Sequence, residues 1–167
     1  MRLTYTLFGT LFAVIGGQRA APAETLGEVH FRFDSSALRT SASTSLAAAA
    51  AFAAEHPDTL IVLDAHCDRI GTAPYNVRLA IRRADAVRDQ LIALGVPRGQ
   101  VVMAIYGEDG PRRATYAEDR RVTMWPTREP VAEVIRRTFD RDGIAVEWGR
   151  RLTTAEIEAA PVPVATR

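Results

Sequence analysis

The chain of 167 residues has a formal charge of +1, with 47% apolar and 25% charged residues, a composition near the average for folded globular proteins. This balance gives no reason to expect a nucleic acid or an anionic surface as partner. The single cysteine, Cys67, excludes an internal disulfide bond.

The first 23 residues have the composition of a secretory signal peptide. Arg2 supplies a positive charge, residues 3–17 contain no charged side chain, and Ala21-Pro22-Ala23 matches the small-x-small cleavage pattern. We therefore expect Glu24 to be the mature N-terminus. The apolar run is shorter than the about 20 residues that span a bilayer, so an uncleaved anchor is only the alternative. No cysteine follows the run, and no later segment reads as membrane-spanning, so we expect an exported chain without lipid modification.

The first half of the mature chain predicts a strand, a helix and a second strand. Residues 29–33 alternate apolar and polar side chains, which is the period of a half-buried strand. Apolar side chains recur at helical spacing over residues 46–53, after Thr40 or Ser41, either of which can cap the helix. Residues 60–63 are continuously apolar, as is typical of a strand buried on both faces.

The second half of the domain predicts a helix and two more strands. Pro74 suits the first position of a helix and Gly95 suits its C-terminal cap. Residues 101–106 and 121–125 have strand character. The order β-α-β-α-β-β predicts an α+β fold, with two helices on one face of a four-stranded mixed sheet, over residues 24–126.

Residues 127–167 are predicted to form a C-terminal extension, which begins after Pro126. Apolar side chains at helical spacing indicate one more helix from about residue 131 to 139, and residues 144–148 a short strand. Thr153 with Glu156 fits a capping box for a last short helix. Forty-one residues are few for an independent core, so we expect an extension packed on the domain or a partly ordered tail.

The best candidate for a binding site is the segment that joins the second strand to the second helix. Asp68 lies in a glycine-containing turn, and Arg83 follows fifteen residues later on the helix. Asn76 lies seven residues before Arg83, which is nearly two helical turns, so the two residues share one helix face. A carboxylate and a guanidinium held close together can bind a ligand that carries both an ammonium and a carboxylate.

Four motifs carry a resemblance to a known family. In chain order they are FRFD at 31–34, HCDRIGTAPYN at 66–76, LAIRRADAV at 79–87 and DRRV at 119–122. Over roughly residues 28–125 the chain resembles the C-terminal peptidoglycan-binding domain of OmpA, which also occurs in peptidoglycan-associated lipoproteins and flagellar stator proteins. The resemblance implies a non-catalytic protein without cofactors, in the periplasm of a Gram-negative bacterium, with association with the outer membrane as a further option.

The same resemblance implies the ligand and the residues that bind it. The ligand would be the diaminopimelate residue of the peptidoglycan stem peptide, with Asp68 accepting from its ammonium and Arg83 holding its carboxylate. Asn76 matches the asparagine at the helix entry of the motif. Cys67 stands where the family usually has threonine, so a thiol would replace a hydroxyl contact with the ligand. Ala80 stands where the helix motif usually has serine, a second departure that could weaken binding.

Other interpretations of these residues stay open at this point. Asp68 and Arg83 could form an ion pair that only fixes the turn to the helix. A cysteine nucleophile is disfavoured because His66 and Cys67, adjacent on an extended segment, point to opposite faces. No histidine or cysteine pair has zinc-like spacing, so we expect no metal site. The alternative function is a structural or assembly protein of an envelope complex, whose residues 127–167 bind a protein partner.

Overall fold

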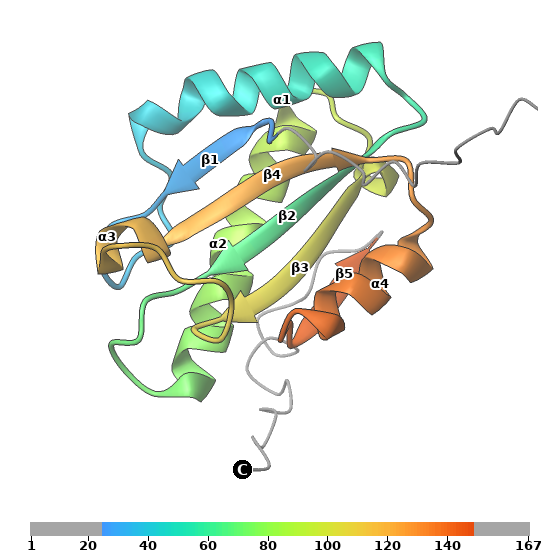
Figure 1. Ribbon diagram of the computed structural model, residues 1–167. Coiled ribbons are helices and arrows are strands. Elements are labelled where there is room, and N and C mark those ends of the chain that lie inside the picture. Colours follow the sequence, from blue (N-terminus) through green and yellow to red (C-terminus); the bar gives the residue numbers. More distant parts are fainter. Residues whose placement is uncertain (1–24, 149–167) are drawn as a thin grey trace, which may run out of the picture.

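The computed structural model describes residues 25–148 and has a mixed β-sheet with helices on both faces (Figure 1). The described strands lie in the order β1-β4-β2-β3-β5. β2 and β3 are parallel, and the other neighbours are antiparallel. The strands are β1 (Gly27–His30), β2 (Leu60–His66), β3 (Val101–Gly107), β4 (Arg121–Thr127) and β5 (Ala145–Trp148).

The helices follow the expected chain order, with additions. The main helices are α1 (Ser43–Glu55), α2 (Ala73–Ala93) and α4 (Val131–Asp140). A short helix, α3 (Tyr116–Asp119), was not expected; it begins with a capping box between Thr115 and Glu118. Two 3-10 turns, η1 (Thr40–Ala42) and η2 (Arg98–Gln100), precede α1 and β3. The predicted signal peptide and the predicted helix around Thr153 lie outside the described residues.

The main core lies between one face of the sheet and the helices α1 and α2. Alternate residues of β2, Ile61, Leu63 and Ala65, point into it and pack with the buried stripe of α2, which includes Ala84 and Leu91. This is the alternation that a strand imposes on its side chains. The expected α+β fold, with two helices on one face of a mixed sheet, is confirmed.

The opposite face of the sheet is covered by α4, which lies in front of the sheet in Figure 1 while α2 lies behind it. Val62, Trp125 and Val134 belong to this second, smaller cluster. The remaining buried members are Val102, Ala104 and Tyr106. The chain after β4 therefore contributes a helix to the fold, as the pattern of apolar residues indicated.

The expected count of four strands is one short, because β5 pairs antiparallel with β3. Glu147 on β5 also accepts a hydrogen bond from the buried Arg88 of α2, at 3.3 Å. Pro126 does not end the sheet: it pairs with Ile61 inside β4. Proline is accommodated there because the β1 pairing stops at Met124, which leaves β4 with one neighbour at that point.

Candidate ligand-binding site

The segment that was singled out in the sequence links β2 to α2. Thr72 caps α2, accepting a hydrogen bond from the Tyr75 N–H at 3.4 Å, and Pro74 lies in the first turn. Gly71 has a φ of +114°, a conformation that L side chains rarely adopt. A glycine is therefore favoured in the turn that connects Asp68 to the start of α2.

Asp68 is sheltered at this turn, with only 4% of its surface exposed. Its Oδ1 accepts from the Ile70 N–H at 3.1 Å, and its Oδ2 accepts from Arg120 Nη1 at 2.9 Å. The ion pair of Asp68 is thus with Arg120, the residue immediately before β4, and no pair with Arg83 is formed. Two charge-assisted or polar bonds hold the carboxylate in one orientation.

Arg83 is fully buried and donates in several directions. Its Nε donates to the Ser35 carbonyl at 3.0 Å, Nη2 to the Arg32 carbonyl at 3.2 Å, and Nη1 to the His66 carbonyl at 3.2 Å. The guanidinium also lies 5.2 Å from the centre of the Phe31 ring. Burial lowers the pKa of Arg83, and the neighbouring Cys67 and Asp68 act in the opposite direction. The side chain therefore joins α2 to the loop after β1 and to the end of β2.

Cys67 and Asn76 are both buried beside this guanidinium. Arg83 Nη1 also donates to Cys67 Sγ at 3.3 Å, and the thiol donates to the Asn76 carbonyl at 3.2 Å. The Asn76 amide donates to Glu108 Oε2 at 2.5 Å. Burial raises the pKa of the Cys67 thiol to about 11, so the thiolate that a nucleophile needs is disfavoured. All four predicted site residues lie close together, and the hydrogen bonds of Asn76 and Cys67 are to other residues of the protein.

His66 points away from Cys67, to the other face of the sheet. Its ring stacks on Tyr106 with centroids 4.8 Å apart, whereas Cys67 belongs to the core under α2. Burial, followed by the charges of Arg121, Arg141 and Arg113, lowers the pKa of His66 to about 3. The two side chains cannot act as a nucleophile and its base, which agrees with the expectation from strand alternation.

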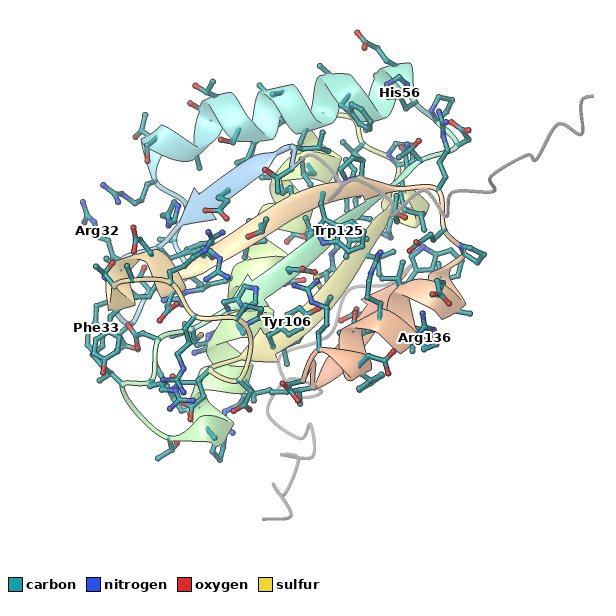
Figure 2. The ribbon with its side chains drawn as sticks, in the orientation of Figure 1. Arg32, Phe33, His56, Tyr106, Trp125 and Arg136 are labelled. Carbon is teal, nitrogen blue, oxygen red and sulfur yellow. The ribbon has the colours of Figure 1, made fainter. Side chains whose placement is uncertain are left out.

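A recess of about 400 Å³ adjoins the point where Arg83 contacts the loop. It is lined by residues of the loop after β1 and of η1: Arg32, Ser35, Ala37, Leu38, Arg39, Thr40 and Ser41. Arg32 and Phe33 lie at this end of the molecule in Figure 2, and Phe33 is exposed. Tyr75 donates a hydrogen bond to Asp34, which ties the loop to the first turn of α2. The loop thus separates Arg83 from solvent.

Arg120 was missed as a site residue. Its position in the motif DRRV gave the only signal, since nothing in the local sequence links it to Asp68. Its Nε also donates to the Phe31 carbonyl at 3.3 Å, so the same side chain touches the loop and the turn. Arg121, the next residue of the same motif, is buried and donates to the Pro111 and Glu118 carbonyls.

Two further properties concern the described part of the chain. Between residues 25 and 148, no three His, Cys, Asp or Glu side chains come together as a metal site would require. Over the same residues, no helix has the length and apolar character needed to span a bilayer.

Comparisons with known proteins agree with these motifs. The peptidoglycan-associated lipoprotein of Pasteurella multocida is 39% identical over 101 residues, which cover 58% of this chain and 67% of the relative. Outer membrane porin F of Pseudomonas aeruginosa is 38% identical over 85 residues, 50% of this chain and 24% of the porin. The chain spans about half to two thirds of the length of the lipoprotein relatives.

Solved structures have the same fold. The crystal structure of the peptidoglycan-associated lipoprotein from Burkholderia pseudomallei matches with a TM-score of 0.54 and 31% identity, covering 60% of this chain and 89% of that one. The C-terminal domain of Helicobacter pylori MotB matches with a TM-score of 0.56, covering 68% and 95%, but at 20% identity it supports the fold alone. The OmpA family model matches residues 30–123, more than half of the sequence, and the chain therefore belongs to the OmpA family.

Proposed function

We propose that this protein binds peptidoglycan in the envelope of a Gram-negative bacterium, without catalysis, through the diaminopimelate residue of the stem peptide. The OmpA family is a non-enzymatic peptidoglycan-binding family, and named relatives are peptidoglycan-associated lipoproteins. The observation that carries the finer proposal is a sheltered Asp68 carboxylate next to the buried Arg83 guanidinium, two opposite charges that share Cys67 as a neighbour.

The proposed ligand carries an ammonium and a carboxylate on one carbon atom. The ammonium would donate to Asp68, whose two oxygens each accept a single protein hydrogen bond and have further lone pairs available. The carboxylate would take the Arg83 donors that now contact the carbonyls of Arg32 and Ser35. Arg120, already bound to Asp68, would move its free donors toward the same carboxylate. Each charge-assisted hydrogen bond contributes about 1.5–3 kcal/mol.

This mechanism requires the loop of residues 32–35 to shift when the ligand enters. Arg32, Phe33 and Asp34 are exposed, so this part of the loop has little packing to lose. The bond from Tyr75 to Asp34 would be the contact that opens. Arg83 would then exchange two main-chain acceptors for one carboxylate and keep its bond to the His66 carbonyl.

The test is sedimentation with isolated sacculi. We expect the purified protein to co-sediment, and Asp68→Ala to lower the bound fraction at least tenfold, because the ammonium loses its only carboxylate partner. Arg83→Lys should lower it similarly, since a lysine keeps the charge but cannot bind a carboxylate in bidentate fashion. Arg82→Lys, the same change at the neighbouring position, is the matched control and should bind as wild type. Equal retention of Asp68→Ala and wild type would exclude the diaminopimelate mechanism.

A second candidate function is a structural or assembly role, in which the C-terminal extension binds an envelope protein. The exposed apolar residues Ile135, Phe139 and Trp148 favour it, because Ile135 and Phe139 are four residues apart and share one face of α4. The sacculus assay separates the two functions. If the folded wild-type protein fails to sediment, the assembly role is the better account.

We also propose an envelope location, periplasmic or associated with the outer membrane. It is supported by the named relatives, which include outer membrane porin F, and by the predicted signal peptide. Fractionation of cells that produce the full chain tests this location, and recovery of the unprocessed chain in the cytoplasm would contradict it.

A further inference from the structure

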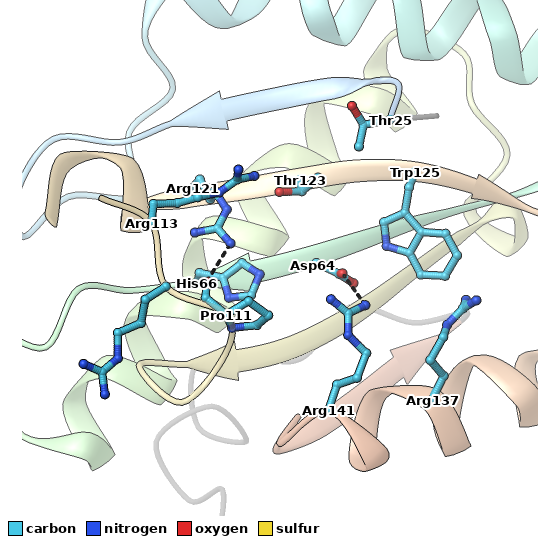
Figure 3. A pocket seen from close by; sticks show the side chains of 11 residues that line it. Thr25, Asp64, His66, Pro111, Arg113, Arg121, Thr123, Trp125, Arg137 and Arg141 are labelled. Atoms are coloured by element: carbon cyan, nitrogen blue, oxygen red, sulfur yellow. Dashed lines mark hydrogen bonds and ion pairs between the residues drawn. The ribbon is translucent and has the colours of Figure 1, made fainter. Parts of the chain in front are cut away.

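A second cleft lies on the other face of the sheet, between β2, β4 and α4 (Figure 3). Its volume is about 430 Å³, within the range of small-molecule sites. Arginine side chains from β4, from the loop after β3 and from the end of α4 surround Asp64 and His66. The motifs of the OmpA resemblance place the wall ligand elsewhere, so this cleft is unassigned.

Polar atoms without a hydrogen-bond partner concentrate in this cleft. Within the described chain, Asp64 Oδ1, Trp125 Nε1 and Arg137 Nη2 are buried without a hydrogen bond of normal geometry, and so is Arg121 Nε at the far end. The Trp125 indole lies close enough to Asp64 to act against the rise that burial causes in the pKa of that carboxyl, and Arg121 Nε has only a 3.8 Å ion pair with Glu28. Asp64, Trp125 and Arg121 are each more than nine-tenths buried. Buried polar groups are almost always hydrogen-bonded, and each one left unpaired costs about 1–3 kcal/mol. Such a concentration of buried polar groups without hydrogen bonds at one cleft is typical of a site for a polar ligand.

Three of these atoms converge at one end of the cleft. Asp64 lies on β2 and Trp125 on the adjacent strand β4. The guanidinium carbon of Arg137 lies 4.0 Å from the centre of the Trp125 ring. Figure 3 shows the indole nitrogen of Trp125 directed toward Asp64, and Arg137 and Arg141 extending from α4 toward both side chains. Arg141 approaches Asp64 only to 3.8 Å, longer than a hydrogen bond. An oxygen acceptor and several nitrogen donors thus face the same space.

The charges at this end are balanced. Arg137 pairs with Glu129 at 2.8 Å and Arg141 with Asp64, so two cations meet two anions. His66 is neutral near pH 7, because its pKa lies at about 3. A ligand that leaves this balance intact has no net charge, but it must offer a cationic donor to Asp64 and oxygen acceptors to the tryptophan and the arginines.

We propose that this end of the cleft is a second binding site, for the ammonium and carboxylate of an α-amino acid. The ammonium donates to Asp64 Oδ1, and the carboxylate accepts from Trp125 Nε1 and Arg137 Nη2. Arg141 is close enough to contribute to the carboxylate when Asp64 turns to the ammonium. The chemistry is shared by a free amino acid and by an amino-acid centre exposed on a larger molecule.

Glycine is the probe, and the indole N–H signals in a ¹H–¹⁵N spectrum are the measurement. The chain has two tryptophans. Trp148, whose Nε1 donates to the Gly99 carbonyl at 2.8 Å on the sheet edge, is the internal control. We expect a saturable shift of the Trp125 signal with glycine and no shift of the Trp148 signal. Acetate carries only the carboxylate of glycine and ethylammonium only the ammonium, so each should bind at least tenfold more weakly.

Two variants test the assignment. Arg137→Gln removes an unpartnered donor, and Arg136→Gln is the matched control, since Arg136 is exposed and pairs with Glu133 and Asp140 away from the cleft. We expect Arg137→Gln to weaken glycine binding at least tenfold and Arg136→Gln to leave it unchanged. Asp64→Asn keeps the shape and should also weaken it. The proposal is overturned if the Trp125 signal does not move, if glycine and acetate act alike, or if Arg137→Gln binds as wild type.

The source of the amino acid is decided with sacculi. If Arg137→Gln sediments with sacculi as wild type does, the ligand is a free amino acid, which is the expected result. If its retention falls while Arg136→Gln is retained, the amino-acid centre is carried by the wall. Asp68→Ala should leave glycine binding to the cleft unchanged, so failure of the wall proposal and failure of this one are distinguishable.

Discussion

Arg83 is a buried cation that is stabilised chiefly by main-chain carbonyls. Three of them, from Arg32, Ser35 and His66, accept its hydrogen bonds, and these residues belong to segments far apart in the chain. A guanidinium suits such a position because its five N–H donors radiate in fixed directions. The residue that the family resemblance marks for binding is therefore also part of the structural core.

Arg83→Met should destabilise the fold by about 3 kcal/mol, because the carbonyls that it serves are left buried without donors. Urea unfolding measures this loss. Arg82→Met, at a half-buried neighbouring position whose guanidinium lies 5.8 Å from the Tyr75 ring centre, should cost much less. Equal losses in the two variants would show that the hydrogen bonds of Arg83 contribute nothing particular. This result also decides how any loss of wall binding by Arg83 variants is read.

His66 makes the stability of the protein depend on pH. Its pKa is about 3 in the folded chain, against about 6.5 in the unfolded chain. Between these two pH values the unfolded state binds a proton at this histidine and the folded state does not. The contribution of His66 to the free energy of unfolding is therefore present in full above pH 6.5 and is lost as the pH drops toward 3. The loss reaches about 2 kcal/mol by pH 5.

His66→Gln removes this titrating group. The change in unfolding free energy between pH 7 and pH 5 should therefore become smaller, even if the variant is less stable overall. His30→Gln is the control, since His30 lies at the rim of the sheet beside Glu28 with 42% of its side chain exposed. A pH dependence that persists unchanged in His66→Gln would contradict the assignment.

At the scale of elements, α4 turns a two-layer domain into one with helices on both faces. Val134 is its fully buried contact with the sheet and packs in the same cluster as Val62 and Trp125. The helix has a sharp division of faces, with Glu133, Arg136 and Asp140 paired on its exposed side. Its docking also sets the position of Arg137 over Trp125, on which the second cleft depends.

Val134→Ala should lower the free energy of unfolding by about 2 kcal/mol, because it removes buried methyl groups and leaves a cavity. Ile135→Ala removes more carbon at the next position, but 38% of Ile135 is exposed, so its cost should be smaller. Thermal or urea unfolding of both variants compares them directly. If Val134→Ala unfolds like wild type, α4 does not belong to the cooperative core.

At the scale of the whole molecule, the sheet separates two polar sites, one at Asp68 and one at Asp64, that both include residues of β2 or of the turn after it. Asp64 and His66 point to the α4 face, while Ala65 and Cys67 point to the α1 and α2 face, as alternation along β2 requires. Asp68, just past the end of β2, lies at the turn into α2. β2 and the turn that follows it thus supply one acidic group each, Asp64 to the proposed amino-acid site and Asp68 to the proposed wall site.

Local patterns in the sequence determined the elements, their order and the family. The strands from 60 and 101, the helix between them and even the helix and strand of the extension depend on periodicity and capping, which act over a few residues. The motif around Asp68 and Arg83 was also readable because its residues lie on one turn and one helix.

Tertiary structure alone decided the partners of those residues. Arg120 is 52 positions from Asp68 and meets it only because β4 pairs with β2. The fifth strand and the cleft over Trp125 likewise depend on how the extension folds back on β3. Local sequence contains propensities and spacings, but long-range pairing is set by which faces must be buried together. The charges that define both sites were therefore visible in the sequence, and their contacts were not.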